Sequence, residues 1–196
     1  GGSGLYIDAV INGIDDLPPA NPETRKNLEQ LLNDSGIISL QELLREKDPA
    51  SFNKIDINNP RRLIRALEVT LSGGKPYSEL IGHRTPVTEW EIVIAGIEWP
   101  REALYSRINQ RVSLMIESGL KKEAENVYEF RNHNALRTVG YKEMFDHLDG
   151  KINLEETIEL ISKNTRNYAK RQMTWFRKYK DMVWINPGET EKLISI

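Results

Sequence analysis

The sequence contains no cysteine among its 196 residues. Disulfide scaffolds, thiolate zinc sites and cysteine nucleophiles are therefore excluded, and the absence of thiols favours a reducing compartment. No apolar run approaches the roughly 18 residues that a membrane helix needs, and no basic segment leads into an apolar one as in a secretory signal. We therefore predict a cytoplasmic protein that does not insert into membranes.

The sequence also has little that would hold a nucleotide phosphate or a metal ion. A P-loop needs the pattern G-x-x-x-x-G-K-[ST], but Val69 occupies the position of its first glycine and Pro76 that of its hydroxyl residue. The three histidines, His83, His133 and His147, show no ligand spacing. We expect them to be ordinary surface or half-buried imidazoles, and we expect no metal site in this chain.

The net charge is only −2, because the chain has 27 basic and 29 acidic residues. This balance argues against a uniformly basic nucleic-acid binder. The charges are unevenly spread, however. Residues 1–60 hold 5 basic and 10 acidic side chains, and residues 61–196 hold 22 and 19. The segment 163–180 holds seven basic residues and no acid, so the average conceals a basic patch.

Hydrophobic periodicity and capping signals predict a chain made mostly of helix. Helices are expected at 5–11, 61–71, 101–118, 120–130, 141–148 and 154–180. Another begins at 21 and stops at 34–36. Further helices are expected to begin at Ser39, which has a capping-box spacing to Glu42, and at 49. Residues 75–89 are expected to form a surface loop. Strands are expected at 91–97, the clearest buried one, and at 182–185. Two strands with this much helix indicate part of a larger α/β domain.

Two pairs of arginines have unusual positions. Arg61 and Arg65 share a face near the start of a helix, where basic side chains oppose the helix dipole, so they either bind an external anion or pair with Glu68 on a solvated surface. Arg111 falls within the apolar stripe of the 101–118 helix. Because burial of an unpaired guanidinium is costly, Arg111 either pairs with an internal carboxylate or faces a cleft for an anionic ligand.

The 154–180 helix carries its basic side chains beside an apolar stripe. No acidic residue between Lys163 and Lys180 can neutralise them within the helix, and a polyanion would relieve their repulsion. Tyr168, Trp175 and Phe176 are either core residues, the more common case, or surfaces on which bases stack.

Five ordered blocks resemble the tRNA dimethylallyltransferases, also called tRNA isopentenyltransferases. They are Gly1 to Tyr6, similar to the family's G-G-[ST]-G-L-Y, and the segments 61–69, 107–111, 138–143 and 165–177, which read RRLIRALEV, RINQR, TVGYKE and TRNYAKRQMTWFR. The blocks span residues 1 to 177. Each is weak alone, but together and in this order they are highly specific.

The resemblance implies a helix-dominated α/β fold, with part of a P-loop-type three-layer core and an all-helical insertion that contacts the tRNA anticodon stem-loop. It implies transfer of a dimethylallyl group from dimethylallyl diphosphate to N6 of the adenosine next to the anticodon, with Mg²⁺ assisting. The adenine must leave its stack to react. We expect the core at residues 1–14 and 76–196 and the insertion at 15–75.

The resemblance also implies roles for individual residues. Arg111 matches the arginine that contacts the diphosphate, and Ser3 matches the hydroxyl residue near the target nucleotide; both are expected to be catalytic. Ser3 is also expected to contact tRNA, together with Arg25, Arg61, Arg62, Arg65, Arg137, Thr138, Gly140, Tyr141, Lys142, Lys170, Arg171, Gln172, Thr174, Trp175 and Arg177.

The family's P-loop, its catalytic aspartate and the expected Mg²⁺ ligands precede the G-G-[ST]-G-L-Y block, with which this sequence begins. We therefore expect the chain to be an inactive C-terminal part of the full enzyme. Two other hypotheses remain: a non-catalytic helical domain that binds structured RNA, and a helical protein-interaction domain without RNA affinity. The oligomeric state is not predicted.

RNA affinity is predicted to depend steeply on salt. If the basic patch neutralises about four phosphates, the association constant should fall by roughly tenfold to a few hundredfold between about 50 and 200 mM salt, because counterions are released on binding. Filter binding with unmodified tRNA measures this slope. A flat salt response would remove the basic patch from the interface.

Overall fold

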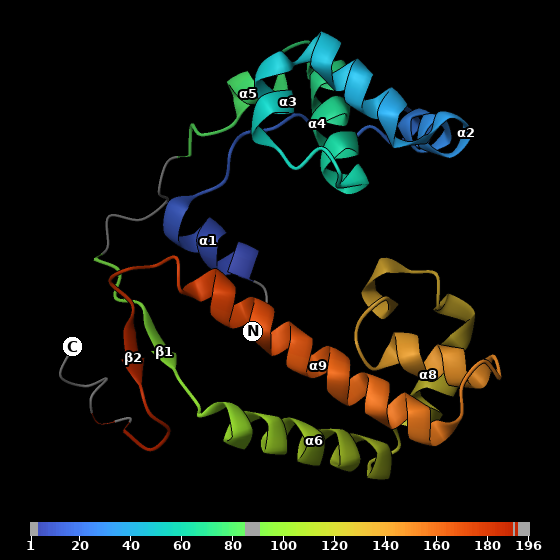
Figure 1. Ribbon diagram of the computed structural model, residues 1–196, viewed down its shortest axis with the longest axis vertical. Coiled ribbons are helices and arrows are strands. Elements are labelled where there is room, and N and C mark those ends of the chain that lie inside the picture. Colours follow the sequence, from blue (N-terminus) through green and yellow to red (C-terminus); the bar gives the residue numbers. More distant parts are fainter. Residues whose placement is uncertain (1–3, 85–90, 190, 192–196) are drawn as a thin grey trace. The chain divides into compact units, whose positions relative to one another are not determined.

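A computed structural model describes residues 4–84, 91–189 and 191 and divides the chain into two compact units (Figure 1). Unit 1 comprises residues 1–4 and 91–196, and unit 2 comprises residues 5–90. The expected insertion, residues 15–75, lies within unit 2. Its status as a separate RNA-contacting domain stays a prediction.

Unit 2 is helical wherever it has regular structure in its described residues. Its helices are α1 (Gly4–Asn12, whose first residue belongs to unit 1), α2 (Pro22–Lys47), α3 (Pro49–Lys54), α4 (Pro60–Gly73) and α5 (Tyr77–Leu80). The short α5 interrupts the loop predicted at 75–89, and residues 85–89 of that loop lie outside the described residues.

Three of these helices start with the same local signal. Asn21, Asp48 and Asn59 each accept backbone N–H groups of the first turn, and each precedes a proline at the first helical position. A side-chain acceptor satisfies donors that the helix leaves unpaired, and proline loses no hydrogen bond there. The three predicted starts are therefore confirmed.

The predicted stop near Gly36 is a kink within α2. Gly36 has φ 75°, a left-handed conformation that other residues adopt only with strain, and helix resumes immediately after it. The prediction that Ser39 caps a new helix is wrong. Its hydroxyl instead donates to the Gly36 carbonyl oxygen at 2.7 Å, because the second half of α2 has already begun.

The core of unit 2 lies between α2 and α4, with α3 against α2. It is built from leucines at helical spacing and their neighbours on α4: Leu28, Leu40, Leu44, Leu63, Ile64, Ala66 and Leu67. The two ends of the unit are joined by buried Asp15, which accepts the backbone N–H groups of Gly82 and His83 and pairs with Arg84 Nε at 2.8 Å.

Unit 1 contains the long α9 (Leu154–Phe176), with α6 (Arg101–Glu117) and α8 (Tyr141–Leu148) packed against it (Figure 1). The short α7 (Leu120–Asn126) follows α6 and precedes two single 3₁₀ turns, Tyr128–Phe130 and Asn134–Leu136. The predicted helix 120–130 therefore breaks at Val127, and α9 ends at Phe176 rather than at Lys180.

A small parallel sheet joins the ends of this unit. Strand β1 (Ala95–Ile97) pairs with β2 (Val183–Ile185), with Ala95 opposite Val183 and Ile97 opposite Ile185. The prediction of a long buried strand at 91–97 is wrong. Only Ala95–Ile97 is strand, and Ile97 is exposed, although Ile185 opposite it in β2 is buried. The second strand and the helix-dominated fold are confirmed.

The core of unit 1 gathers where α9 meets α6, α7 and α8. Its buried members are Val112, Leu120, Ala124, Met144, Phe145 and Ile161. The contribution of α9 comes from its first half, and this leaves the second half of the helix available at the surface.

Asp48 joins two parts of unit 2. Its carboxylate is buried and accepts the Ser51 N–H at 3.0 Å, the Ser78 N–H at 2.8 Å and the Ser78 hydroxyl at 2.7 Å. Burial alone would raise the pKa of Asp48. The hydrogen bonds from Ser51 and Ser78 outweigh it and hold the pKa below its ordinary value.

We predict that Asp48→Asn lowers the free energy of unfolding by about 2–3 kcal/mol at neutral pH, because an amide places a donor against these donors. Since the folded-state pKa is depressed, the contribution is complete above the unfolded pKa, near 4, and is lost as pH falls through the folded value. Denaturation of both proteins at about pH 7 and about pH 3 measures this. An equal difference at both values would contradict the assignment.

Candidate active site and nucleic-acid interface

The buried residues of α9, Thr157, Ile161 and Ser162, all lie in the first half of the helix. Its start is fixed by a reciprocal pair, in which Asn153 accepts the Glu156 N–H and Glu156 accepts the Asn153 N–H, both at 2.9 Å. Further along, Tyr168 and Trp175 are 38% and 39% exposed. The more common core reading of these two aromatic side chains is therefore wrong, and their rings are partly accessible.

Arg111 lies on a cleft of about 830 Å³ in unit 1. The wall that belongs to α6 is apolar apart from Arg111 itself, and the facing wall belongs to α9. Between them lies the segment 137–139. The lining residues are Leu104, Ile108, Arg111, Val112, Met115, Arg137, Thr138, Val139, Ile161, Thr165, Tyr168, Ala169 and Gln172.

This geometry decides between the two alternatives for Arg111. The side chain is exposed rather than buried, and no ion pair of Arg111 is found in the described part of the chain. The expected internal carboxylate is thus absent from those residues. Arg111 is an exposed residue that lines the cleft, so its side chain is accessible to a ligand.

The cleft brings together four of the residues predicted from sequence: Arg111, Arg137, Thr138 and Gln172. The two guanidiniums come from segments 26 positions apart in the chain. Two cations that line one largely apolar cleft favour negative charge more strongly than the same cations in open water would. The arrangement therefore suits an anionic group attached to an apolar one.

A second cleft, of about 790 Å³, lies between β1, the start of α6 and the end of α9. Lys170, Gln172, Thr174 and Arg177 line it, as does Arg101, which the sequence did not single out. The spacing of four between Arg101 and its partner Tyr105 was a usable signal for this pair.

Tyr105 lies in the same cleft beside basic side chains. Partial burial would raise the pKa of its hydroxyl, but the hydrogen bond from Arg101 Nε, at 3.2 Å, and the charges of Arg101 and Lys170 outweigh burial and lower the pKa. The phenol thus lies in a positive potential, as a group near an anion site would.

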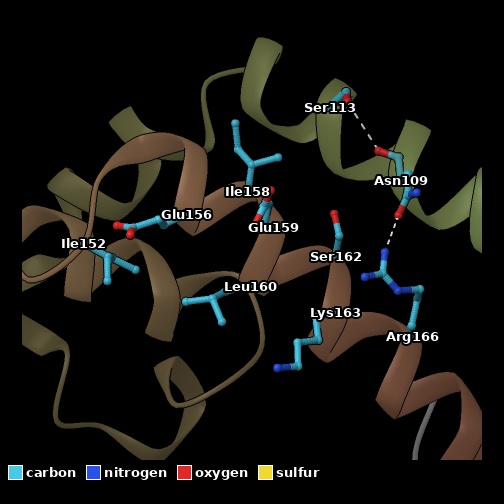
Figure 2. Close-up of a pocket in the computed structure, with 10 residues that line it drawn as sticks. All are labelled: Asn109, Ser113, Ile152, Glu156, Ile158, Glu159, Leu160, Ser162, Lys163 and Arg166. Carbon is cyan, nitrogen blue, oxygen red and sulfur yellow. Dashed lines mark hydrogen bonds between the residues drawn. The ribbon is translucent and has the colours of Figure 1, made fainter.

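The basic patch of α9 divides into two parts. In the first, Arg166 Nη1 donates to Asn109 Oδ1 at 2.7 Å, and Lys163 shares a cleft of about 650 Å³ with Glu156 and Glu159 (Figure 2). These cations have polar or acidic neighbours. The second part, residues 170–177, carries the side chains that were expected to contact RNA.

Lys170, Arg171, Thr174 and Arg177 are exposed in this second part. Arg171 lies over the Tyr168 ring at 5.7 Å, Lys178 lies over the Trp175 ring at 4.2 Å, and Arg177 forms an exposed 3.5 Å ion pair with Glu98. Exposed pairs of this kind contribute little to stability. These cations and rings form a surface of the type that binds nucleic-acid phosphates and bases.

Segment 137–142 is held against α9 by Glu143, a buried residue that the sequence did not single out as functional. Glu143 Oε2 accepts the Gly140 N–H at 2.8 Å, and Oε1 accepts Asn164 Nδ2 at 2.6 Å. Gly140 has φ 104°, which favours glycine. The spacing of Gly140 and Glu143 signals the first contact, but nothing in the sequence signals Asn164.

The expected contact residues of this segment differ in accessibility. Arg137, Thr138 and Lys142 are exposed, whereas Gly140 is buried. Tyr141 is half-buried, stacks on Phe145 with ring centroids 6.0 Å apart, and donates its hydroxyl to Glu123, which raises the pKa of the phenol. Gly140 and Tyr141 therefore shape the segment, and the exposed residues are the ones placed to touch a ligand.

The arginines of unit 2 gather only in part. Arg65 Nη1 lies 3.1 Å and Arg25 Nη1 lies 3.8 Å from Glu68 Oε2. The sequence allowed Glu68 to pair with Arg65 or Arg61 on a solvated surface. Arg65 is the partner, and Glu68 is buried rather than solvated. Arg61 and Arg62 are exposed.

Ser3 and the histidines are the remaining residues singled out from the sequence. Ser3 lies outside the described residues. His83 and His147 contact the carbonyl oxygens of Glu79 and Ile152, as ordinary imidazoles do. Within residues 4–84, 91–189 and 191, no group of three acidic or histidine side chains is placed to hold a metal ion, and no helix has the length and apolarity to span a membrane.

A model of the family described as IPP transferase matches residues 1–179. The chain belongs to the IPP transferase family. The resemblance seen in the five sequence blocks is thereby confirmed.

Relatives of this chain are named tRNA dimethylallyltransferases. It is 47% identical over 194 residues to a tRNA dimethylallyltransferase of Christiangramia forsetii, covering 99% of this chain and 64% of that protein. A tRNA dimethylallyltransferase of Cytophaga hutchinsonii is 42% identical over 195 residues, with 100% and 64% covered. The chain thus spans 64% of the length of each of these two relatives.

Solved structures show the same likeness. The full-length tRNA isopentenylpyrophosphate transferase of Bacillus halodurans is 39% identical with a TM-score of 0.58, covering 95% of this chain and 58% of that one. A eukaryotic dimethylallyltransferase acting on tRNA is 25% identical with a TM-score of 0.74, covering 95% and 50%. The helical fold of this IPP transferase chain therefore matches part of each structure.

We predict that Glu143→Gln lowers the free energy of unfolding of this IPP transferase chain by about 1–3 kcal/mol. The amide that replaces the carboxylate keeps the Gly140 hydrogen bond only if its NH₂ group faces Asn164, whose side-chain amide must then turn its oxygen inward. Either a hydrogen bond is lost or hydrogen bonds to a charged carboxylate become weaker neutral ones. Urea denaturation measures the loss, with exposed Glu129→Gln as control. Equal stability of the two variants would show that Glu143 does not hold the segment.

Proposed function

We propose that the protein containing this chain transfers a dimethylallyl group from dimethylallyl diphosphate to N6 of the adenosine next to the anticodon of a tRNA. One observation carries the assignment. Arg111 faces an apolar-walled cleft that also holds Arg137, and the substrate consists of a short apolar group attached to a diphosphate. Membership of the IPP transferase family supports the same reaction class.

The reaction is a substitution at the allylic carbon. The N6 lone pair forms the new bond to that carbon, the bond from the carbon to the diphosphate oxygen breaks, and the electron pair leaves with the diphosphate. N6 then loses a proton. Charge therefore grows on the leaving oxygen, and a guanidinium beside it stabilises the transition state more than the ground state. We assign this role to Arg111, with Arg137 as a second cation on the cleft.

The RNA is assigned to the exposed basic surfaces. Residues 170–177 offer cations and the partly exposed rings of Tyr168 and Trp175, and Arg137 and Lys142 lie on the segment beside the cleft. Arg25, Arg61, Arg62 and Arg65 form a further cationic group in unit 2. We propose that residues 15–75 are the insertion that contacts the anticodon stem-loop and that Ser3 lies near the target nucleotide.

The remaining chemical groups are assigned to the part of the curated relatives that this chain does not match. We place there the P-loop of a three-layer core and the proton acceptor for N6. The described residues do not fit Mg²⁺, since they offer no cluster of ligands, so no metal-dependent step is assigned to them. By this proposal the 196-residue chain alone does not catalyse transfer.

We predict that Arg111→Ala in the full-length protein lowers kcat for dimethylallyl transfer by about 10²- to 10³-fold, as loss of one charge-stabilising group typically does. Affinity for tRNA should change by less than about twofold. Single-turnover transfer and filter binding measure the two quantities.

The matched control is Arg107→Ala, four residues earlier on α6. Arg107 lies over the Trp99 ring at 4.3 Å and does not line the cleft of about 830 Å³, although it shares a smaller cleft of about 470 Å³ with Arg111, so its loss should leave kcat within about threefold. Equal losses of rate and tRNA affinity in the Arg111 variant would contradict the diphosphate role.

A further inference from the structure

Glu68 is a buried carboxylate in the middle of a leucine-rich helix. It lies on α4 between Leu67 and Val69, and only 1% of its surface is exposed. Helix α4 supplies four residues to the core of unit 2, where it packs against α2. A charged side chain at such a position carries a large desolvation cost, which its partners must offset.

The partners are two arginines from different helices. Glu68 Oε2 lies 3.1 Å from Arg65 Nη1 on α4 and 3.8 Å from Arg25 Nη1 on α2. The second oxygen, Oε1, is buried and has no hydrogen-bond partner in the described part of the chain. One oxygen therefore serves two guanidiniums while the other serves none.

This ion pair is expected to contribute little to the free energy of unfolding. Buried ion pairs seldom repay their desolvation unless every oxygen is satisfied, and an apolar side chain of similar size commonly does as well. The two guanidiniums are also not enclosed, since the Arg25 and Arg65 side chains are 48% and 39% exposed. The carboxylate is fixed within the core, while the cations that it holds face outward.

We propose that Glu68 is a positioning residue that holds Arg25 and Arg65 side by side as one clamp for an RNA phosphate. The proposal rests on the proposed function for the identity of the partner. Two guanidiniums that share one carboxylate oxygen keep N–H donors directed outward, and a phosphate accepts donors from two such groups at once. The clamp also links α2 to α4.

Glu29 is the other carboxylate beside this pair. Its Oε1 lies 3.2 Å from Arg25 Nε, and its side chain is 55% exposed. An exposed pair of this kind is worth little and exchanges readily with solvent. Glu29 therefore competes with a phosphate for Arg25, whereas buried Glu68 holds the guanidinium from behind.

A positioning role and a purely electrostatic role of Glu68 predict opposite changes in RNA affinity when the carboxylate is neutralised. Loss of any negative charge beside an RNA site should strengthen RNA binding by simple Coulomb attraction. If Glu68 positions the two arginines, its neutralisation frees the Arg65 side chain, whereas Arg25 keeps its pair with Glu29, and the cost of ordering Arg65 on binding then lowers the affinity. That cost is worth about three- to tenfold in affinity for each side chain.

The test uses the full-length protein and unmodified tRNA, with Glu68→Gln and the matched control Glu29→Gln. We expect Glu68→Gln to weaken tRNA affinity by about three- to tenfold and to raise KM for tRNA with little change in kcat. Glu29→Gln, which removes the same charge from the same arginine, should bind equally well or more tightly. In an Arg25→Gln, Arg65→Gln background, Glu68→Gln should no longer weaken binding.

A measurement on the unmutated protein covers the case in which Glu68→Gln does not fold. Nitrogen-15 relaxation of the arginine Nε groups, without RNA, should show Arg25 and Arg65 more ordered than Arg62. Arg62 is an exposed neighbour on α4 for which no ion pair is found among the residues described. Equal mobility of Arg65 and Arg62 would overturn the proposal.

The outcomes separate the clamp from the proposed function. If the full-length protein binds tRNA and Glu68→Gln binds it as tightly or more tightly, the clamp is wrong and the proposed function stands. If the full-length protein binds no tRNA, both are wrong. Both are supported if Glu68→Gln weakens tRNA binding in the otherwise unmutated protein and has no effect on it in the Arg25→Gln, Arg65→Gln background.

Discussion

A buried carboxylate must have partners, and this constraint organises both units of the chain. Four such groups each tie together segments that are separate in sequence or structure. Asp15 binds the backbone at Gly82, and Asp48 joins the start of α3 to α5. Glu68 pairs with arginines of α2 and α4, and Glu143 binds the segment that follows Arg137 to α9. Because removal of either partner leaves an unsatisfied buried group, these contacts determine where the neighbouring functional side chains lie.

The cations follow the opposite pattern. Arg111, Arg137, Lys170 and Arg171 are exposed, and the ion pair of Arg177 is itself exposed. Acidic residues are thus used inside for positioning, and basic residues are left outside for a ligand. The basic surface on α9 follows from the local sequence, because residues 163–180 contain seven basic residues and no acidic one although the net charge of the chain is −2.

Features coded by neighbouring residues were predictable from the sequence. The Asx–Pro helix starts, the α9 helix and the second strand all follow local rules. Features that depend on tertiary contacts were not. The 91–97 segment has the composition of a buried strand, but only Ala95–Ile97 forms a strand and Ile97 is exposed. Ser39 caps no helix, because Gly36 bends α2 without ending it. The contact of Glu143 with Asn164 joins α8 to α9. For Arg111 the sequence predicted a side chain on an apolar stripe, but the side chain is exposed and lines a cleft, which follows from the packing of α6 against α9.

The central claim is that this chain supplies the RNA-facing and diphosphate-facing parts of a dimethylallyl transfer site without being sufficient for transfer. The most direct measurement compares the full-length protein with the 196-residue chain, using dimethylallyl diphosphate, unmodified tRNA and mass spectrometry of the anticodon-loop nucleosides. We expect N6-dimethylallyladenosine with the full-length protein, and tRNA binding without product for the chain alone. Product from the chain alone, or none from the full-length protein, would contradict the account.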